Sequence, residues 1–387
     1  MINLVQDTID KDDIKSLISW LDQENIPRLT KGELTVQLEK KWAEKIGTKY
    51  SVFVNSGSSA ILLALAVLKE FRLIKNNKLV APALSWATDV SSPLLLGFDT
   101  RLCDCNLTDL SCDLTHLEKI FIDFEPAVFI SVAPLGLVPN MKKLINLCEK
   151  YDVILLEDVC ESMGSTYDNK YLGSFGFASF FSTYFGHHLS TIEGGFINTD
   201  NEEFYHGLLM MRSHGWDRDL PEFKQKDLRK ESNVDDFSAL YTFFVPGMNL
   251  RSTDLQAFIG IRAVDKLDSF SSVRNKNFNL YLKLVKDNLI DIIPKPTDFV
   301  SNFAFPVVSN NKSSIIENLK KQKVECRPLI AGNMANKPFW IKNYGKSNDF
   351  PNADLIDQLG FYVPNHQGLT ENEIELVANI INGENIK

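Results

Sequence analysis

The 387-residue sequence lacks several features that mark common classes of protein. It has no excess of positive charge, because 41 lysines and arginines stand against 50 aspartates and glutamates, for a net charge of −9. This balance argues against a surface built to bind nucleic acid or an anionic membrane, although one basic pocket could still bind a phosphate. The longest clean apolar run, residues 60–68, is far shorter than the ~20 residues that span a bilayer. With no recognisable export signal either, we expect a cytoplasmic protein.

The sequence also lacks the cysteine pattern of a disulfide framework or a metal cluster. Its six cysteines include Cys103 and Cys105, with Cys112 nearby, but no two are separated by two residues. Cys103 and Cys105 fall in a stretch with the pattern of a strand. We therefore predict buried structural thiols here rather than metal ligands.

What is present is an ordinary globular composition, with 44% hydrophobic and 24% charged residues, in a chain long enough for two domains. Over the first 250 residues, helical patterns alternate with short apolar runs. The helices are expected over residues 13–24, 35–47, 59–70 and 141–151, and the strands over 78–83, 100–104, 127–132 and 153–156. This alternation predicts an α/β fold with a largely parallel sheet, whose functional residues follow the carboxyl ends of the strands.

The pattern changes after Pro246 and Gly247. We expect a long helix over residues 252–288 and then a smaller α+β segment, with strands over 303–308 and 325–329 and helices over 314–323 and from 371 onward. The predicted domains are therefore a large cofactor-binding α/β domain, residues 1–250, and a small C-terminal α+β domain, residues 251–387. The charged stretch 217–236 fits a solvated loop and a mobile flap equally well.

Several segments at predicted strand ends carry residues suited to chemistry. The turn Asn-Ser-Gly-Ser-Ser at residues 55–59 opens a helix and could bind a phosphate or serve only as an N-cap. Trp86 could stack on a planar ring or pack in the core. Asp158 follows a buried apolar strand, where an unpaired carboxylate is costly, so it needs a cationic partner such as a protonated pyridine nitrogen. Glu161 could face the same cavity.

Two adjacent histidines, His187 and His188, precede a glycine-bearing turn. They could suggest a metal site, but neighbouring residues rarely bind one ion together, and no carboxylate lies at helical spacing from them. We therefore predict no metal site.

Together these segments resemble a known family. The Ser-Gly-Ser turn, Trp86, the Leu-Glu-Asp run at residues 156–158 and the run from Phe181 to Gly195 are similar, across essentially the whole chain, to the DegT/DnrJ/EryC1/StrS sugar aminotransferases. The resemblance implies the fold-type I pyridoxal phosphate fold, with a mostly parallel seven-stranded sheet between helices. It also reveals a departure. Where the family has the lysine that binds the cofactor covalently, this chain has His187, and residues 181–199 contain no lysine.

The segments at residues 213–216, 246–251, 324–328 and 364–367 resemble one branch of that family, which removes the 3-hydroxyl of GDP-4-keto-6-deoxy-D-mannose during colitose synthesis. The resemblance implies a lyase that holds pyridoxamine or pyridoxal 5′-phosphate noncovalently and uses L-glutamate as amino donor. Gly186 departs from the serine expected in this branch, which removes one potential hydrogen bond near the cofactor.

Carried over residue by residue, the resemblance assigns His187 as the catalytic base, a role that suits imidazole near neutral pH. It implies that Trp86 stacks on the pyridine ring and that Asp158 pairs with the ring nitrogen. The residues assigned to the cofactor are Gly57, Ser58, Trp86, Asp158, Glu161, Ser182 and, from the partner subunit of a homodimer with a shared active site, Asn249. The residues assigned to the substrate are His214, Arg218 and Arg327.

Three alternatives compete with this assignment. A related branch acts on CDP-4-keto-6-deoxyglucose with an iron–sulfur cluster, but this chain has no cysteine between Cys160 and Cys326 to bind one. A noncatalytic homologue that only binds a nucleotide sugar would not require Asp158 and Trp86. An ordinary aminotransferase would need a remote lysine. The sequence does not decide between GDP and CDP or fix the sugar stereochemistry.

Overall fold

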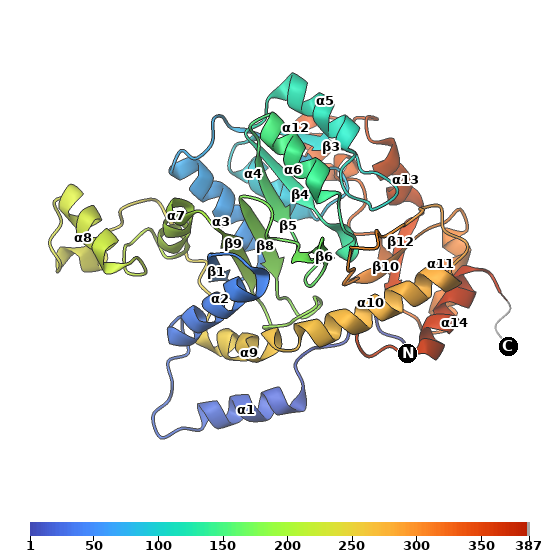
Figure 1. Ribbon diagram of the computed structural model, residues 1–387, viewed down its shortest axis with the longest axis horizontal. Coiled ribbons are helices and arrows are strands. Elements are labelled where there is room, and N and C mark those ends of the chain that lie inside the picture. The colour runs from blue at the N-terminus through green and yellow to red at the C-terminus, as the bar shows by residue number, and fades with distance from the viewer. Residues whose placement is uncertain (385–387) are drawn as a thin grey trace.

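A seven-stranded sheet forms the centre of the computed structural model, which describes residues 1–384 (Figure 1). Its strand order is β1-β9-β8-β5-β4-β2-β3, and β9 alone runs against the others. The strands are β1 Tyr50–Val54, β2 Lys78–Pro82, β3 Asp99–Cys103, β4 Val128–Val132, β5 Ile154–Asp158, β8 Ala178–Ser182 and β9 Gly195–Thr199. The predicted α/β fold with a mostly parallel sheet is confirmed, and the four predicted strands match β2 to β5 to within two residues.

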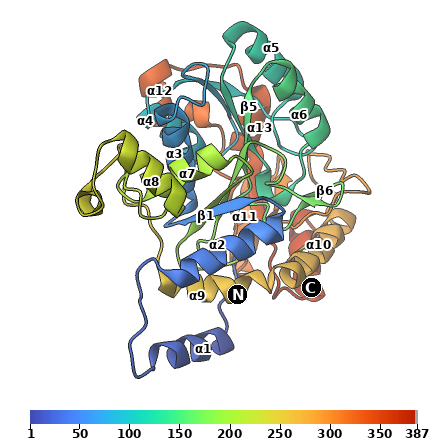
Figure 2. The ribbon, with the colours of Figure 1, turned by 60° about the vertical axis from the view of Figure 1, so that its left-hand side comes forward.

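Helices cover both sides of this sheet, as the turned view shows (Figure 2). Because both faces are covered, strands such as β4 and β8 are buried along their whole length. The helices are α1 Lys11–Leu21, α2 Glu33–Ile46, α3 Gly57–Glu70, α4 Ala87–Leu95, α5 Leu114–Phe124, α6 Met141–Lys150, α7 Glu202–Arg212, α8 Glu222–Glu231, α9 Asp254–Val264, α10 Leu267–Leu284, α11 Lys312–Lys321, α12 Pro338–Tyr344, α13 Pro351–Leu359 and α14 Glu371–Ile381. None of the helices within residues 1–384 is both long and apolar enough to cross a bilayer.

Two predictions about local structure need correction. The long helix expected over residues 252–288 is two helices, α9 and α10, which are separated at Asp265 and Lys266. Lys266 turns there toward α1 and forms ion pairs with Asp10 and Asp13. The charged stretch 217–236 is not a plain loop, because it contains α8 and projects from the body of the molecule as an arm (Figure 1). A role as a mobile flap stays a prediction.

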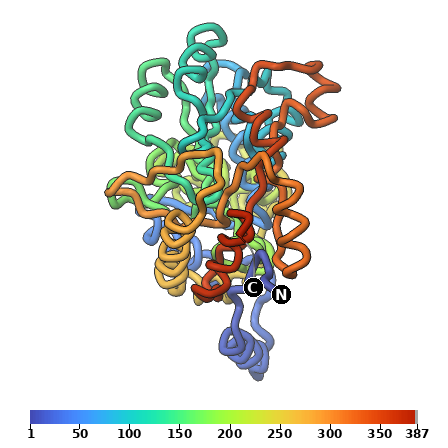
Figure 3. Tube along the Cα trace, turned by 90° about the vertical axis from the view of Figure 1, so that its right-hand side faces the viewer, coloured from blue at the N-terminus to red at the C-terminus, as the bar shows by residue number. Residues whose placement is uncertain are grey.

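The C-terminal part contains a second, antiparallel sheet of order β10-β12-β11. Its strands are β10 Ala304–Val308, β11 Arg327–Pro328 and β12 Gly360–Pro364, and a separate short hairpin joins β6 Thr166–Tyr167 to β7 Lys170–Tyr171. The first residues of the chain lie against this part, since Ile2 forms a parallel bridge with Val324 (Figure 3). A division of the chain near residue 250 stays a prediction.

The predicted buried thiols are confirmed, because Cys103, Cys105 and Cys112 are all buried. Burial raises the pKa of the Cys103 thiol well above its usual range. Within residues 1–384, no group of three His, Cys, Asp or Glu side chains is placed to hold a metal ion.

A buried ion pair ties a strand of the large sheet, β1, to two helices, α2 and α7. Arg212, at the end of α7, is fully buried and donates to the Glu39 carboxylate on α2 and to the Phe53 carbonyl on β1. Glu39 also accepts the Phe53 main-chain N–H at 2.8 Å. Because β1 leads directly into α3, this network fixes the position from which α3 starts.

We expect Arg212→Met to destabilise the fold by about 3–5 kcal/mol, because it leaves the Glu39 carboxylate buried without its cation. Chemical denaturation of the purified variant measures this loss. Lys40→Met is the control, because Lys40 lies exposed on α2 and should cost little. An Arg212→Met variant that unfolds at the wild-type denaturant concentration would contradict the assignment.

Candidate active site

A cavity of about 710 Å³ lies where the carboxyl ends of β1, β2, β5 and β8 meet. Of the predicted site residues, it brings together Gly57, Ser58, Trp86, Asp158, Glu161, Ser182, His187 and Arg327. These residues come from the strand ends of the large sheet, except for Arg327, which lies on β11 of the small sheet. No lysine is among the residues that line this cavity in the described part of the chain.

The N-terminus of α3 forms one end of the cavity. Ser56 is its N-cap and accepts the Ser59 main-chain N–H at 3.0 Å, while Gly57 and Ser58 begin the helix. The first N–H groups of a helix have no partner inside it and together with the helix dipole favour a phosphate. Gly57 must be glycine, because an added Cβ would lie 2.8 Å from the Ser182 Cβ. Ser182 and the start of α3 therefore form one surface suited to an anion.

Asp158 forms the floor of the cavity. It is the last residue of β5, it is buried, and its Oδ1 accepts the Cys160 main-chain N–H at 2.8 Å. Burial raises its pKa, and no lysine, arginine or histidine within residues 1–384 forms a salt bridge with it. A carboxylate buried beside a cavity without a cation of its own is suited to a ligand that brings a positive charge.

Trp86 supplies an aromatic surface to the same cavity. It is the N-cap of α4 and is 57% exposed, which rules out core packing as its main role. A free indole and a buried carboxylate facing one space suit a planar aromatic cation, and the α3 N-terminus suits a phosphate on it. The residues present therefore fit a pyridine cofactor with a phosphate group.

The two adjacent histidines have different environments. The ring of His187 lines the cavity, and its Nδ1 is buried without a hydrogen-bond partner, so Nε2 is the nitrogen open to the cavity. Burial lowers its pKa to about 4, the neighbouring Arg274 guanidinium lowers it further, and the Cys160 main-chain carbonyl opposes both. His187 is therefore a neutral imidazole at pH 7, ready to accept a proton.

His188 points into the protein. It is fully buried, and its Nε2 lies 2.8 Å from the Ser301 carbonyl. The histidine pair is thus one residue facing the cavity and one residue that holds the loop against the C-terminal part.

Glu161 is a second acid beside the cavity. Its carboxylate accepts the Leu135 main-chain N–H at 3.0 Å. Burial raises its pKa to about 7, and the nearby Asp158 charge adds to this rise. Glu161 therefore exchanges its proton near neutral pH, unlike an ordinary surface glutamate.

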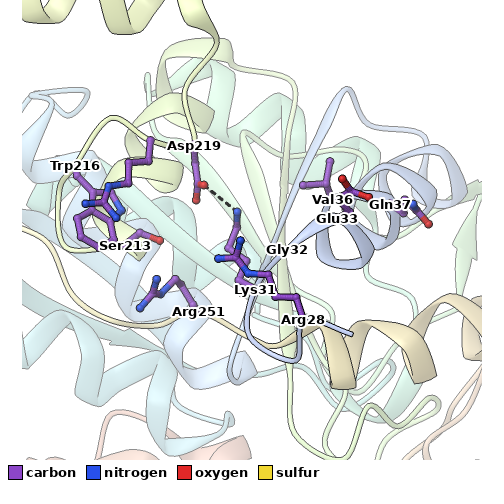
Figure 4. Close-up of a pocket in the computed structure, with 11 residues that line it drawn as sticks. Arg28, Lys31, Gly32, Glu33, Val36, Gln37, Ser213, Trp216, Asp219 and Arg251 are labelled. Atoms are coloured by element: carbon purple, nitrogen blue, oxygen red, sulfur yellow. Dashed lines mark hydrogen bonds and ion pairs between the residues drawn. The ribbon is translucent and has the colours of Figure 1, made fainter. Parts of the chain in front are cut away.

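Three predicted residues do not line this cavity in the same chain. Arg218 lines a second cavity of about 680 Å³, shown in Figure 4, and its guanidinium stacks over Trp216 at 3.8 Å. His214 packs edge-on against the same Trp216. Asn249 is exposed on a neighbouring segment and accepts from Arg251 Nε at 3.0 Å.

The second cavity is basic in a chain that is acidic overall. Arg28, Lys31, Arg218 and Arg251 surround it, and Lys31 pairs with Asp219 at 2.9 Å (Figure 4). Arg28 and Lys31 were not predicted. The only sequence signal for this cavity is a pair of basic residues between Pro27 and Gly32. Such a pair is also common in ordinary surface turns, so it does not by itself indicate a binding site.

Sequence reasoning also missed several residues that line the main cavity. Phe303 and Tyr362 reach it from the C-terminal part, and Asn3, Leu4 and Val5 reach it from the first residues of the chain. No local pattern marks them, because tertiary contacts bring these segments to the cavity. The pairing of β10 with β12 places the C-terminal residues, and the Ile2–Val324 bridge helps to place the first residues of the chain.

Comparison with known proteins supports this geometry. The sequence profile of the DegT/DnrJ/EryC1/StrS aminotransferase family matches residues 7–382. The GDP-4-keto-6-deoxy-D-mannose 3-dehydratase of Escherichia coli O55:H7 is 36% identical, with 98% of this chain and 100% of that protein covered.

Two solved structures are similar over 98% of this chain and all of theirs. One is a GDP-4-keto-6-deoxymannose-3-dehydratase with a trapped PLP-glutamate geminal diamine, at 34% identity and a TM-score of 0.89. The other is a histidine-to-asparagine variant of such an enzyme with bound GDP-perosamine, at 32% identity and a TM-score of 0.87.

The close packing at Gly57 generates a prediction. Gly57→Ala places a methyl group against Ser182 and 3.2 Å from the Cys160 sulfur, so we expect a loss of about 1–3 kcal/mol in stability. A lower thermal unfolding midpoint would show it. Ser58→Ala, at the exposed next position, should unfold close to wild type. Equal unfolding midpoints for Gly57→Ala and wild type would contradict this packing.

Proposed function

The chain belongs to the DegT/DnrJ/EryC1/StrS aminotransferase family, and we propose that it is a pyridoxamine phosphate-dependent 3-dehydratase of GDP-4-keto-6-deoxy-D-mannose. The product would be GDP-4-keto-3,6-dideoxy-D-mannose, with L-glutamate regenerating the cofactor. The observation that carries this proposal is His187, which takes the place of a lysine in a cavity that contains Asp158 and Trp86 but no lysine in its described lining. Such a reaction belongs to the cytoplasmic synthesis of dideoxysugars, such as colitose, for the lipopolysaccharide O-antigen.

The cavity residues would hold pyridoxal or pyridoxamine 5′-phosphate without a covalent bond. When bound, this cofactor supplies an amino group for the 4-keto carbon of the sugar and a ring that accepts an electron pair. The α3 N-terminus with Ser58 and Ser182 binds its phosphate, and Trp86 stacks on its ring. Asp158 accepts a hydrogen bond from the protonated ring nitrogen, and this attraction keeps the proton in place.

His187 moves the protons of the reaction. Its neutral Nε2 faces the cavity and can take a proton from the carbon that carries the cofactor amine. The resulting imidazolium can return that proton to the 3-hydroxyl as it leaves. Imidazole does not form the stable link to an aldehyde that lysine forms, so the cofactor amine stays free for the substrate.

The reaction can be tested directly with purified protein, pyridoxal 5′-phosphate, L-glutamate and GDP-4-keto-6-deoxy-D-mannose. Mass spectrometry separates the expected product, which has lost one oxygen, from the 4-amino sugar that an aminotransferase would make. The CDP-linked 4-keto-6-deoxy sugar, run in parallel, decides the nucleotide. If neither substrate gives a product, the proposed reaction is wrong and the protein only binds nucleotide sugars.

Replacing His187 tests its role as the base. We expect His187→Asn to slow dehydration by about a hundredfold to ten-thousandfold, because asparagine has no nitrogen that accepts a proton near neutral pH. Binding of the nucleotide sugar should survive, as it does in the histidine-to-asparagine variant of the relative. Turnover and GDP-sugar binding are measured separately.

The matched neighbour is His188→Asn. Because His188 bonds to Ser301 inside the protein, its loss should lower the unfolding midpoint and spare turnover in the folded fraction. The assignment fails if His187→Asn still removes the 3-hydroxyl near the wild-type rate, or if His188 proves the more sensitive residue for turnover.

The active enzyme is proposed to be a homodimer in which the second cavity of one subunit faces the main cavity of the other. Asn249 and Arg251 then reach the cofactor phosphate and the substrate of the partner subunit. The segment that directly follows the arm supports this arrangement, because its aromatic residues Phe237 and Tyr241 are 83% and 79% exposed in the single chain. Apolar surface of this kind marks contacts between proteins.

Mixing two inactive variants tests the shared site. His187→Asn and the double variant Asn249→Ala/Arg251→Ala damage opposite halves, so subunit exchange should restore one intact site per mixed dimer and about a quarter of wild-type activity. The control mixes His187→Asn with Asp158→Asn, which damage the same half and should restore nothing. Failure of the first pair to recover after confirmed exchange, or a fully active monomer, would refute the arrangement.

A further inference from the structure

Asp89 is a buried acid that the proposed mechanism does not use. It lies in the first turn of α4, three residues after Trp86, and is 0% exposed. Both of its carboxyl oxygens are buried, and neither accepts a hydrogen bond from a main-chain or side-chain N–H or O–H group of the described residues. It does not line the main cavity, although its neighbour Thr88 does. A buried carboxylate without a donor or a cation beside it is strongly disfavoured in its ionised form. The groups around Asp89 therefore decide whether it carries a proton.

The groups that face Asp89 are acidic. Its carboxyl group lies within hydrogen-bonding reach of the Asp158 carboxyl group, and Glu161 is the next charged group. Cys160 is the neighbouring thiol. The main chain at Trp86, the N-cap of α4, lowers the pKa of Asp89 but does not offset the effects that raise it. No lysine, arginine or histidine within residues 1–384 forms a salt bridge with Asp89.

Two carboxyl groups in contact cannot both be ionised at low cost, so one proton must be shared between them. Asp158 is the better anion of the two, because its Oδ1 already accepts the Cys160 main-chain N–H. Burial, followed by the Asp158 charge, raises the pKa of Asp89 well above its usual range. The proton therefore belongs mainly to Asp89.

We infer that Asp89 is a positioning residue, a neutral carboxylic acid that donates its proton to Asp158 and so fixes the carboxylate that faces the cavity. The inference rests on the proposed function, in which Asp158 holds the ring nitrogen of the cofactor. With one proton between them the two acids carry a single negative charge, which matches the single positive charge of a protonated pyridine ring. The Cys160 N–H and the Asp89 proton together hold the carboxylate in one orientation.

The first test needs no cofactor. In the unfolded chain Asp89 has its ordinary pKa of about 3.9, and in the folded protein that pKa is raised, so the folded state binds the extra proton. Stability must then fall as pH rises between those two values, by up to about tenfold in the unfolding equilibrium per pH unit. Asp89→Asn removes this dependence. Its unfolding midpoint, relative to wild type, should rise steadily from pH 5 to pH 8.

The exposed Asp99→Asn variant, at the start of β3, is the control and should keep a constant difference from wild type over this range. A constant difference for Asp89→Asn as well would mean that Asp89 is ionised in the folded protein, and would overturn the inference.

The second test measures binding of pyridoxamine 5′-phosphate by calorimetry. Asn at position 89 still donates a hydrogen bond to Asp158, whereas Leu has nearly the same shape and donates none. We therefore expect Asp89→Asn to bind close to wild type and Asp89→Leu to bind at least about tenfold more weakly, as for a lost hydrogen bond to a charged group. Equal binding by Asp89→Leu and wild type would overturn the positioning role.

The two tests separate this inference from the proposed function. If wild-type protein does not bind pyridoxamine 5′-phosphate at all, the proposed function fails, while the pH test still decides whether Asp89 carries a proton. If Asp89→Leu gives no cooperative unfolding transition, binding by Asp89→Asn decides instead. Retained binding supports donation to Asp158, and binding lost to the level of Asp158→Asn contradicts it.

Discussion

The interaction on which the site depends is the burial of acidic groups without cations beside them. Asp158, Glu161 and Asp89 lie at one end of the large sheet, and burial raises the pKa of each. The fold tolerates them because hydrogen bonds offset part of the cost of burying their charge. Asp158 accepts the Cys160 N–H, Glu161 accepts the Leu135 N–H, and Asp158 and Asp89 share a proton. What remains is a cavity with a net preference for a cation, next to a helix end with a preference for an anion. A ligand with a cationic ring and a phosphate group can bind the carboxylates with the ring and the helix end with the phosphate.

The same constraint explains why His187 can replace lysine. A neutral imidazole leaves the carboxylates available, and Arg274, which bonds to the carbonyls of Asn302, Phe303 and Asn365, helps to keep it neutral. The buried guanidinium thus acts on the site from behind, through the loop that carries His187 and His188.

The sequence was sufficient for the parts of the fold that depend on neighbours in the chain. The apolar strands β2 to β5 and the helix after the Ser-Gly-Ser turn follow from local pattern. The roles of the cavity residues at the strand ends followed from the resemblance to a known family. It was not sufficient where tertiary contacts decide. The break between α9 and α10 depends on the pairing of Lys266 with α1, and the exposed Trp86 could not be told from a core tryptophan. Asp89 was missed because its significance lies only in its contact with Asp158.

The pairing of the first residues with Val324 has a consequence for how the protein is made. Asn3, Leu4 and Val5 line the main cavity, but the strand segment against which Ile2 bonds is more than 300 residues later in the chain. During synthesis from the N-terminus, the large sheet can close while these first residues still lack their partner. The cavity is therefore completed only after the segment around Val324 has been made, more than 300 residues after Asn3, Leu4 and Val5.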